Sequence, residues 1–253
     1  MILETKKLWF KKAVFFLEDV LPTRAVLEQK YSSVNIISYQ KLDLPGWRVR
    51  EKDTALIDLT LTEDEIFRKF NDTTRNEIRR TFKSNNLVFS GPQPLTQEIY
   101  DMYVNFERSQ SRVPISYKEA CSFVFFVASY NNKLISCISV VQSGSYLRVR
   151  SIFSARLQSD FEIKKIIGNA SRRIMWGVCL WGKNNGFTSL DLASVDKSNP
   201  GVSSIVAFKL SFGGNVVSEY THIYKSKTFS LFEEIFLIKS KCVKFLHNIV
   251  NKI

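Results

Sequence analysis

A short segment late in the chain places one lysine between two aromatic residues and ends on two glycines: Phe208-Lys209-Leu210-Ser211-Phe212-Gly213-Gly214. A β-type run, Leu190-Asp191-Leu192, and a turn-rich loop over 196–201 precede it. The order of strand, loop, helical turn and further strand predicts the edge of a substrate cleft. A purely hydrophobic core would not need a charged side chain at this position.

Basic side chains gather on the helix expected after Thr62. Six basic residues and two acidic ones lie between Arg68 and Lys83. This local excess of positive charge allows two interpretations. Either the helix face is solvated, or it binds an anion, with Arg75 and Arg79 among the residues that hold it.

The helix expected over 163–183 has two faces of different composition. One face is apolar and is predicted to lie on a sheet: Ile163, Ile166, Ile167, Ala170, Ile174, Val178 and Trp181. The opposite stripe carries Lys165, Asn169, Arg172, Trp176 and Lys183. Either Trp176 packs beneath a neighbouring segment while the cations are solvated, or the stripe binds phosphate. In the second case Asn169 and Arg172 are donors, and Lys164 or Lys165 adds charge.

The hydrophobic pattern predicts an α/β (α+β) protein. Strands are expected at 14–17, 34–39, 54–59, 123–130, 133–142, 145–153, 189–193 and 216–224. Hairpin turns at 131–132 and 143–144 favour an antiparallel meander. An interrupted helix is expected from the capping box of Thr62 and Glu65 to about residue 84, and further helices over 96–108, 116–123, 161–183 and 231–251. We therefore expect a β-rich N-terminal extension, 1–60, packed on one domain, 61–253.

Composition limits the class of partner and the compartment. The 253 residues carry a formal net charge of +12, which favours nucleic acid, phosphorylated small molecules or an acidic membrane surface. The four cysteines are far apart and none has a histidine at ligand spacing, so we expect neither a metal site nor a disulfide framework. The chain shows no signal peptide and no apolar run of membrane-spanning length, so the expected location is the cytoplasm.

The predicted order of elements from Lys133 to Tyr224 resembles the C-terminal half of a known acyltransferase fold. That fold is shared by the N-acetyltransferase superfamily and the Fem-type peptidoglycan aminoacyltransferases, and its central sheet is mixed, mostly antiparallel and flanked by helices. Four segments carry the resemblance: 74–80, 167–172 with Trp176 following, 190–192 and 208–214. The chain is most similar to short, single-domain Fem-like proteins associated with bacterial surface polysaccharide synthesis.

The resemblance implies acyl transfer. An acetyl or aminoacyl group would move from an activated carrier, acyl-CoA or aminoacyl-tRNA, to an amine or hydroxyl of a sugar or amino-acid intermediate. That intermediate would be nucleotide-linked or lipid-linked and belong to cell-surface polysaccharide or peptidoglycan synthesis. Phe208 and Lys209 would line the reaction centre, where Lys209 stabilises the oxyanion.

The chain also departs from both groups of proteins that it resembles. Full-length Fem enzymes contain two such folds and a coiled-coil arm, whereas this chain has room for one fold and an extension. Residues 154–160 contain no counterpart of the glycine-rich loop that binds acyl-CoA in simple acetyltransferases. The identity of the acyl donor therefore stays open.

An amine nucleophile must lose a proton, so a base is expected near the reaction centre. Asp191 is one candidate, although a carboxylate at a strand end also caps loop amides or pairs with a lysine. His222 is another, and strand alternation places Tyr220 and Tyr224 on the same side as a site wall. No Ser-His-Asp or Cys-His order is evident, so we expect direct transfer without a covalent acyl-enzyme.

Two other classes of function stay open. The net charge of +12 favours a tRNA-dependent enzyme or an RNA-binding protein, although the basic residues form no recognised binding motif. A non-catalytic, membrane-peripheral scaffold is the third class. The predicted helix over 231–250 is apolar and carries Lys239, Lys241 and Lys244, which suits either the inner face of the membrane or core packing.

Overall fold

The computed structural model describes residues 1–17, 20–155, 160–195 and 203–235. Their contacts divide the chain into two units. Residues 52–219, with Met1, form the central unit, and residues 2–51 together with the described residues from 220 onward form the terminal unit. From the sequence we expected a boundary near residue 60 instead. The difference arises because β10 (Asn215–Lys225) pairs with β3 (Ser33–Ser38), and no local sequence signal marks so distant a pairing.

The sheet of the central unit has the strand order β4-β9-β8-β7-β6-β5. Its strands are β4 (Arg48–Asp58), β9 (Ser189–Ser194), β8 (Tyr146–Ser154), β7 (Lys133–Ser143), β6 (Val124–Tyr130) and β5 (Leu87–Gln93). Neighbouring strands are antiparallel except β8 and β9, which are parallel. The prediction of a mixed, mostly antiparallel sheet with a meander at its centre is confirmed.

The interrupted helix after Thr62 is also confirmed. In α2 (Glu63–Lys69) the Thr62 hydroxyl accepts from the Glu65 N–H, and the Glu65 carboxylate accepts from the Thr62 N–H, so the capping box is complete. Phe70 and Asn71 break the helix, and Asn71 caps α3 (Asp72–Thr81). Two further helices are α4 (Gln97–Ser109) and α5 (Tyr117–Ala120), of which α5 is shorter than expected.

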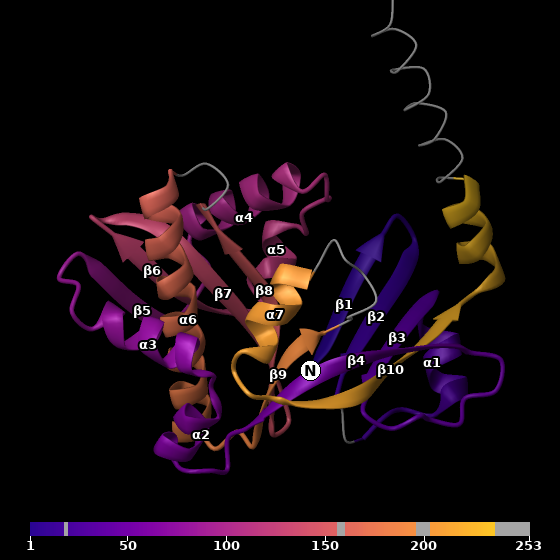
Figure 1. Ribbon diagram of the computed structural model, residues 1–253. Coiled ribbons are helices and arrows are strands. Elements are labelled where there is room, and N and C mark those ends of the chain that lie inside the picture. Colours follow the sequence, from indigo (N-terminus) through magenta and orange to yellow (C-terminus); the bar gives the residue numbers. More distant parts are fainter. Residues whose placement is uncertain (18–19, 156–159, 196–202, 236–253) are drawn as a thin grey trace, which may run out of the picture. The chain divides into compact units, whose positions relative to one another are not determined.

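The long helix α6 (Phe161–Asn184) covers one face of the central sheet (Figure 1). Four of the predicted core-face residues are buried: Ile167, Ala170, Ile174 and Val178. The hydroxyl groups of Ser171 in α6 and Ser136 in β7 are 2.7 Å apart. Phe153, the cross-strand partner of the adjacent Cys137, contacts Tyr103 of α4 instead. Because successive strand residues face opposite ways, α4 and α6 cover opposite faces of the sheet.

The lysine segment forms α7 (Ser203–Leu210) and the turn after it. Gly213 has φ +66°, and a Cβ built there would lie 2.1 Å from the carbonyl oxygen of Lys69. A side chain at this position would therefore be strained and would also collide with the backbone at the C-terminal end of α2. Glycine is required here because the turn passes directly beside another segment.

The terminal unit contains β1 (Ile2–Lys7), β2 (Phe10–Phe16), β3 and the second half of β10, in that order. Helix α1 (Arg24–Lys30) packs on β3, and Leu27 of this helix belongs to a core with Phe15 and Trp47. Strand β1 and helix α1 were not predicted. Residues 227–235 are helical, and the rest of the helix expected over 231–251 lies outside the described residues.

Candidate functional site

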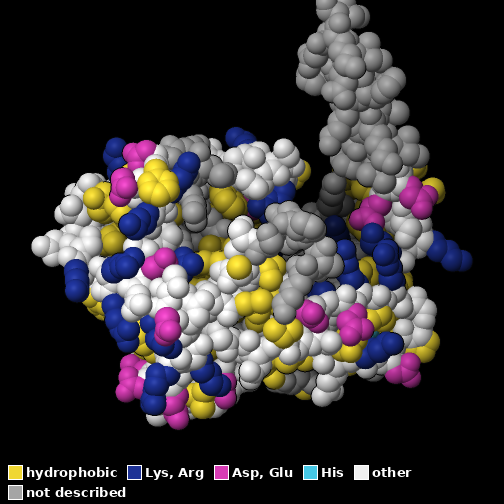
Figure 2. Space-filling model, viewed as in Figure 1, with side chains coloured by type: hydrophobic (Ala, Val, Ile, Leu, Met, Phe, Trp, Pro, Cys, Tyr) yellow, Lys and Arg dark blue, Asp and Glu magenta, His cyan; other side chains and the backbone are white. Residues whose placement is uncertain are grey.

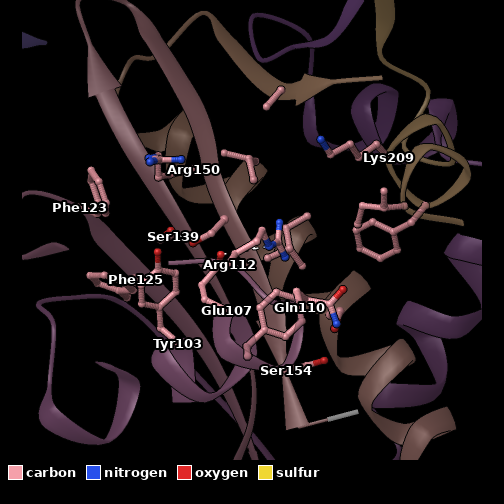
Figure 3. A pocket seen from close by; sticks show the side chains of 18 of the residues that line it. Tyr103, Glu107, Gln110, Arg112, Phe123, Phe125, Ser139, Arg150, Ser154 and Lys209 are labelled. Carbon is pink, nitrogen blue, oxygen red and sulfur yellow. Dashed lines mark hydrogen bonds and ion pairs between the residues drawn. The ribbon is translucent and has the colours of Figure 1, made fainter. Parts of the chain in front are cut away.

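A cavity of about 1030 Å³ lies in the central unit (Figure 3). Its lining comes from α4 and the loop that follows it, from strands β6 to β9, and from α6 and α7. Aromatic and aliphatic side chains form much of the wall, and Lys209, Arg150, Arg172, Arg112 and Glu107 supply its charges. A mixed lining of this size is typical of a small-molecule site.

The cavity lies where two parallel strands separate. Strands β8 and β9 pair only over 146–148 and 189–191. Beyond these residues, Val149 to Ile152 of β8 and Ala193 and Ser194 of β9 line the cavity. Residues of α4 and α6, which cover opposite faces, also line it, as expected of an opening between the two strands.

Strand β8 carries a bulge at this opening. Ser139 of β7 pairs with Ser151, and the next residue, Val140, pairs with Val149, so Arg150 is an extra residue in β8. In a regular strand alternate side chains face opposite ways, whereas a bulge redirects the inserted residue. The bulge explains how four consecutive residues, 149–152, can all line the cavity.

Lys209 reaches the cavity from α7, as expected of the lysine segment (Figure 3). Its ammonium group donates a hydrogen bond of 2.8 Å to the backbone carbonyl of Ser194. Burial lowers the pKa of Lys209 to about 8, although the negative charge of Asp191 opposes the shift. The group is thus a weakly hydrated cation that keeps most of its charge at neutral pH.

Asp191 lies in a buried cluster of charges next to this lysine. One oxygen of its carboxylate accepts from the Thr54 hydroxyl and from the Ala193 N–H, the latter at 2.7 Å. The other oxygen binds Arg148, which also binds Glu219 at 2.5 Å, and Lys52 pairs with Glu219 at 3.0 Å. Because several donors already engage its carboxylate, Asp191 is better suited to orient β9 than to accept a proton.

Arg172 and Phe208 also line the cavity, so three of the sequence-predicted site residues meet there, these two and Lys209. The Arg172 guanidinium lies over the Phe208 ring, 5.2 Å from its centroid, and pairs with Glu77 at 2.9 Å. The ion pair ties α6 to α3, and the ring contact ties α6 to α7. Arg172 therefore forms part of the wall that carries the lysine segment.

Other predicted anion-binding residues lie elsewhere in the central unit. Trp176 is buried against Phe67 and Phe70 of the α2 region, with ring centroids 5.1 and 5.7 Å away, as the packing interpretation expected. Lys165 is exposed on α6, and Asn169 is half-buried. The described lining of the cavity includes none of these three.

Arg75 and Arg79 lie on α3. Arg75 donates to the carbonyls of Arg68 and Phe70 at 2.7 and 2.6 Å, and so satisfies the C-terminal end of α2. Arg79 lies over the Phe67 ring at 5.5 Å. The exposed side chains of α2, of α3 and of the residues just after α3 carry both signs of charge (Figure 2). The basic ones are Arg68, Lys69, Arg79, Arg80 and Lys83, and the acidic ones are Glu63, Asp64, Glu65 and Asp72.

The proposed wall of Tyr220, His222 and Tyr224 belongs to the terminal unit. His222 is buried, and its Nε2 accepts from the Leu42 N–H at 3.0 Å. Burial lowers the pKa of His222, so the neutral imidazole is favoured. Tyr224 stacks on Trp47 at 5.4 Å, and the Tyr220 hydroxyl donates to Glu51. The described lining of the cavity comes from the central unit instead.

Sequence reasoning missed the contribution of α4 and β8. Tyr103 and Glu107 of α4 and Arg150 of β8 all line the cavity, and Glu107 pairs with Arg112 at 3.2 Å. The sequence of α4 reads as an ordinary amphipathic helix, and Glu107 within it gave no sign of a site. A register shift between two strands leaves no local mark in the sequence either.

The N-terminus of α6 is a poor place for the pyrophosphate of an acyl-CoA. Asp160 caps this helix and accepts from the Ile163 N–H at 2.9 Å, and Glu162 lies in the first turn. These carboxylates already use the positive end of the helix and would repel a further anion. Residues 156–159, which precede the cap, lie outside the described residues.

Two further searches concern the described residues only. No group of three or more His, Cys, Asp or Glu side chains in this part of the chain could hold a metal ion. None of the helices described here combines the length and the apolar character needed to cross a membrane.

No protein-family model matches the chain, and a search of curated proteins gave no match. Solved structures do resemble it. FemX superposes with a TM-score of 0.61 at 12% sequence identity, over 92% of this chain and 86% of that chain. The C-terminal DUF2156 domain of a lysylphosphatidylglycerol synthetase from Agrobacterium fabrum gives 0.54 at 13%, over 88% and 81%. L-PGS from Bacillus licheniformis gives 0.52 at 13%, over 89% and 81%.

At these identities the likeness concerns the fold. The chain has the fold of FemX and of the lysylphosphatidylglycerol synthetase domain, and the Fem-like mixed, mostly antiparallel sheet flanked by helices that was expected from its sequence is confirmed.

Proposed function

We propose that the protein is an acyltransferase and that the cavity of the central unit is its reaction site. The observation that carries the proposal is the position of Lys209, a cation at the wall of a mostly apolar cavity, held by the Ser194 carbonyl. The fold, which is that of FemX, supports the same reaction class.

In such a reaction an amine or hydroxyl of the acceptor attacks the acyl carbonyl carbon. A new bond to nitrogen or oxygen forms, the bond between the acyl group and its carrier breaks, and the carbonyl oxygen gains negative charge in between. Lys209 would stabilise that charge, and a donor of this kind in a poorly hydrated site lowers the activation barrier by about 3 kcal/mol. Because its pKa is about 8, the lysine is mostly protonated at neutral pH.

The acceptor proton needs a base within reach of the cavity. Asp191 is engaged by Thr54, Ala193 and Arg148, and His222 belongs to the terminal unit. Among the described lining residues, only Glu107 carries a carboxylate, and that group pairs with Arg112 at 3.2 Å. Glu107 is therefore the base that we assign to direct transfer without a covalent acyl-enzyme.

The transferred group is acetyl or aminoacyl, and the acceptor is a sugar or amino-acid intermediate of cell-surface polysaccharide or peptidoglycan synthesis. A nucleotide-linked or lipid-linked intermediate suits the net charge of +12. The reaction would occur in the cytoplasm or at the inner face of the membrane. Of the two carriers, acyl-CoA is the less favoured because Asp160 and Glu162 occupy the start of α6.

A tRNA-linked donor or an RNA ligand is a second candidate that a specific observation favours. Three exposed cations, Arg79, Arg80 and Lys83, lie at the end of α3 and just after it, where they offer contacts to the phosphates of a polyanion. Retention of tRNA that falls steeply between about 50 and 200 mM salt would support it. If the protein did not retain tRNA at the lower salt concentration, a small acyl carrier such as acyl-CoA would be the donor.

The experiment that tests the proposal is a ligand panel followed by a transfer assay. Thermal unfolding is measured with acetyl-CoA, longer acyl-CoAs, aminoacyl-tRNA, UDP-amino sugars and nucleotide-linked deoxyamino sugars. A ligand at about 100 times its Kd stabilises the folded protein by about 2.7 kcal/mol. The ligands that stabilise the protein are then paired, and transfer of a labelled acyl group is followed. Binding without transfer for every pair of bound donor and acceptor would contradict the proposal.

A further inference from the structure

One wall of the cavity is formed by hydrogen-bond donors that lack acceptors in the described part of the chain. Figure 3 shows Tyr103, Ser139 and Arg150 on the side opposite Lys209. Arg150 lies over the Phe123 ring at 5.7 Å, and no described carboxylate pairs with it. The ring supports the guanidinium and leaves its N–H groups available to a ligand.

The serine pair beside the bulge has one donor to spare. The hydroxyl groups of Ser139 and Ser151 are 2.6 Å apart, and Ser139 is fully buried. Two hydroxyls carry two protons, and the bond between them uses one. The second proton has no acceptor among the described residues, so the pair can donate one hydrogen bond to a molecule in the cavity.

Tyr103 also has a hydroxyl proton that can be donated to a ligand. Its hydroxyl oxygen accepts from the Ile115 N–H at 3.3 Å, and its own proton has no described acceptor. Burial raises the pKa of this phenol, which therefore keeps its proton. Of the four donors, Ser139 is buried, Tyr103 and Ser151 are half-buried and Arg150 is exposed, so water can reach this wall and a ligand that fills the cavity would replace that water as acceptor.

The bulge places these groups together. Without the extra residue in β8, Arg150 would face away from Val149 and Ser151. With it, the guanidinium joins the serine hydroxyls at the cavity wall. Three kinds of donor, one of them a cation, meet there, and the one carboxylate in the described lining, Glu107, is already paired with Arg112.

We propose that Tyr103, Ser139, Arg150 and Ser151 form a subsite for an oxyanion, a carboxylate or a phosphate, carried by a substrate of the cavity. This proposal rests on the proposed function, because only that function makes the bound molecule a substrate. It adds that one reactant carries an anionic group at the end that lies away from Lys209. Arginine binds a carboxylate and a phosphate alike through paired N–H donors, so the same subsite could accept either group.

Binding of simple probes tests the subsite without any transfer assay. Arginine Nε–H signals of the full chain are followed by NMR while acetate, inorganic phosphate or the neutral acetamide is added. The Arg150 signal of the wild type is expected to shift in a saturable way with an anion and not with acetamide. The anion that binds more tightly, acetate or phosphate, shows whether the substrate group is a carboxylate or a phosphate. Arg150→Lys should keep part of the affinity because the charge stays while the paired donors are lost.

Two variants complete the test. Arg150→Gln should weaken binding of the preferred anion, followed on the remaining signals, at least about tenfold. Arg108→Gln removes the same charge from an exposed position of α4 outside the described lining and should leave the affinity unchanged. Equal affinities of the wild type and Arg150→Gln, or equal binding of acetamide and acetate, would overturn the subsite. Anion binding in a protein that transfers no acyl group would overturn the proposed function alone.

Discussion

The ammonium group of Lys209 lies 2.8 Å from the carbonyl oxygen of Ser194 and donates a hydrogen bond to it. Ser194 follows Ala193, which has the left-handed φ of 59°, and the Ala193 N–H is held by the Asp191 carboxylate. One aspartate thus stabilises the unusual backbone that presents a carbonyl to the lysine. We conclude that Asp191 acts on the cavity by positioning.

Replacing Asp191 should therefore affect stability strongly. In Asp191→Asn, Arg148 loses a charged partner inside a buried cluster, and breaking such a pair typically costs about 3–5 kcal/mol. Urea unfolding measures the change. Asp101→Asn, at an exposed position of α4, is the matched control and should stay within about 0.5 kcal/mol of the wild type. A small effect at Asp191 would mean that the cluster relaxes without it.

Lys209 should be costly to the folded state at neutral pH. Burial lowers its pKa from 10.5 to about 8, so the charged form is disfavoured on folding. Lys209→Met should raise the free energy of unfolding at neutral pH by about 1–3 kcal/mol. Lys133→Met, at an exposed strand end, provides the control for a change of one charge.

The pH dependence of that difference has a definite sign. Below the folded pKa both states carry the proton, and the full penalty applies. Between about pH 8 and 10.5 the folded state has lost the proton that the unfolded state still binds, so the wild type gains stability as pH rises. The advantage of Lys209→Met should shrink across this range, and a constant difference would contradict the lowered pKa.

His222 should make the stability of the terminal unit sensitive to acid. Its pKa in the folded state lies below the ordinary value of 6.5, so the unfolded state binds the proton first as pH falls. Its contribution to stability is present above that value and is lost progressively below it. His222→Gln should lose less stability than the wild type between about pH 7 and 5. Parallel curves for the two proteins would show that His222 is not the group responsible.

Gly213 should be intolerant of a side chain. Its φ is +66°, and an added Cβ would lie 2.1 Å from the Lys69 carbonyl oxygen, so Gly213→Ala should destabilise by more than about 2 kcal/mol. Gly177, in α6, has nothing within 4 Å of the same atom. Gly177→Ala should stabilise by about 0.5–1 kcal/mol through helix propensity. Similar effects of the two changes would refute the steric explanation.

Local patterns predicted the elements that depend on neighbouring residues. The capping box at Thr62, the hairpin turns of the meander and the apolar stripe of α6 are all properties of short segments, and the structure contains each of them. Lys209, Phe208 and Arg172 were identified because the resemblance rests on the segments that carry them, and all three line the cavity. Trp176 stood out on the polar stripe because α2 covers it with Phe67.

The remaining features depend on contacts between distant segments. The pairing of β3 with β10 sets the division into units, and the register shift between β7 and β8 brings Arg150 to the cavity. Neither has a local signature, so the α4 and β8 walls went unrecognised. Strand β1 was not predicted; Lys6, Lys11 and Lys12 lie in the first hairpin, whose buried side chains include Ala13 and Phe15.

The most direct test of the account is the rate of acyl transfer by Lys209→Met, measured with the donor and acceptor that bind the wild type. Loss of the cation should lower the rate about 10²–10³-fold and leave donor affinity within about twofold, while Lys133→Met should keep the wild-type rate. The wild-type rate should also fall above about pH 8, where Lys209 loses its charge. A rate for Lys209→Met within about twofold of the wild type would contradict the assignment of this cavity as the site of transfer.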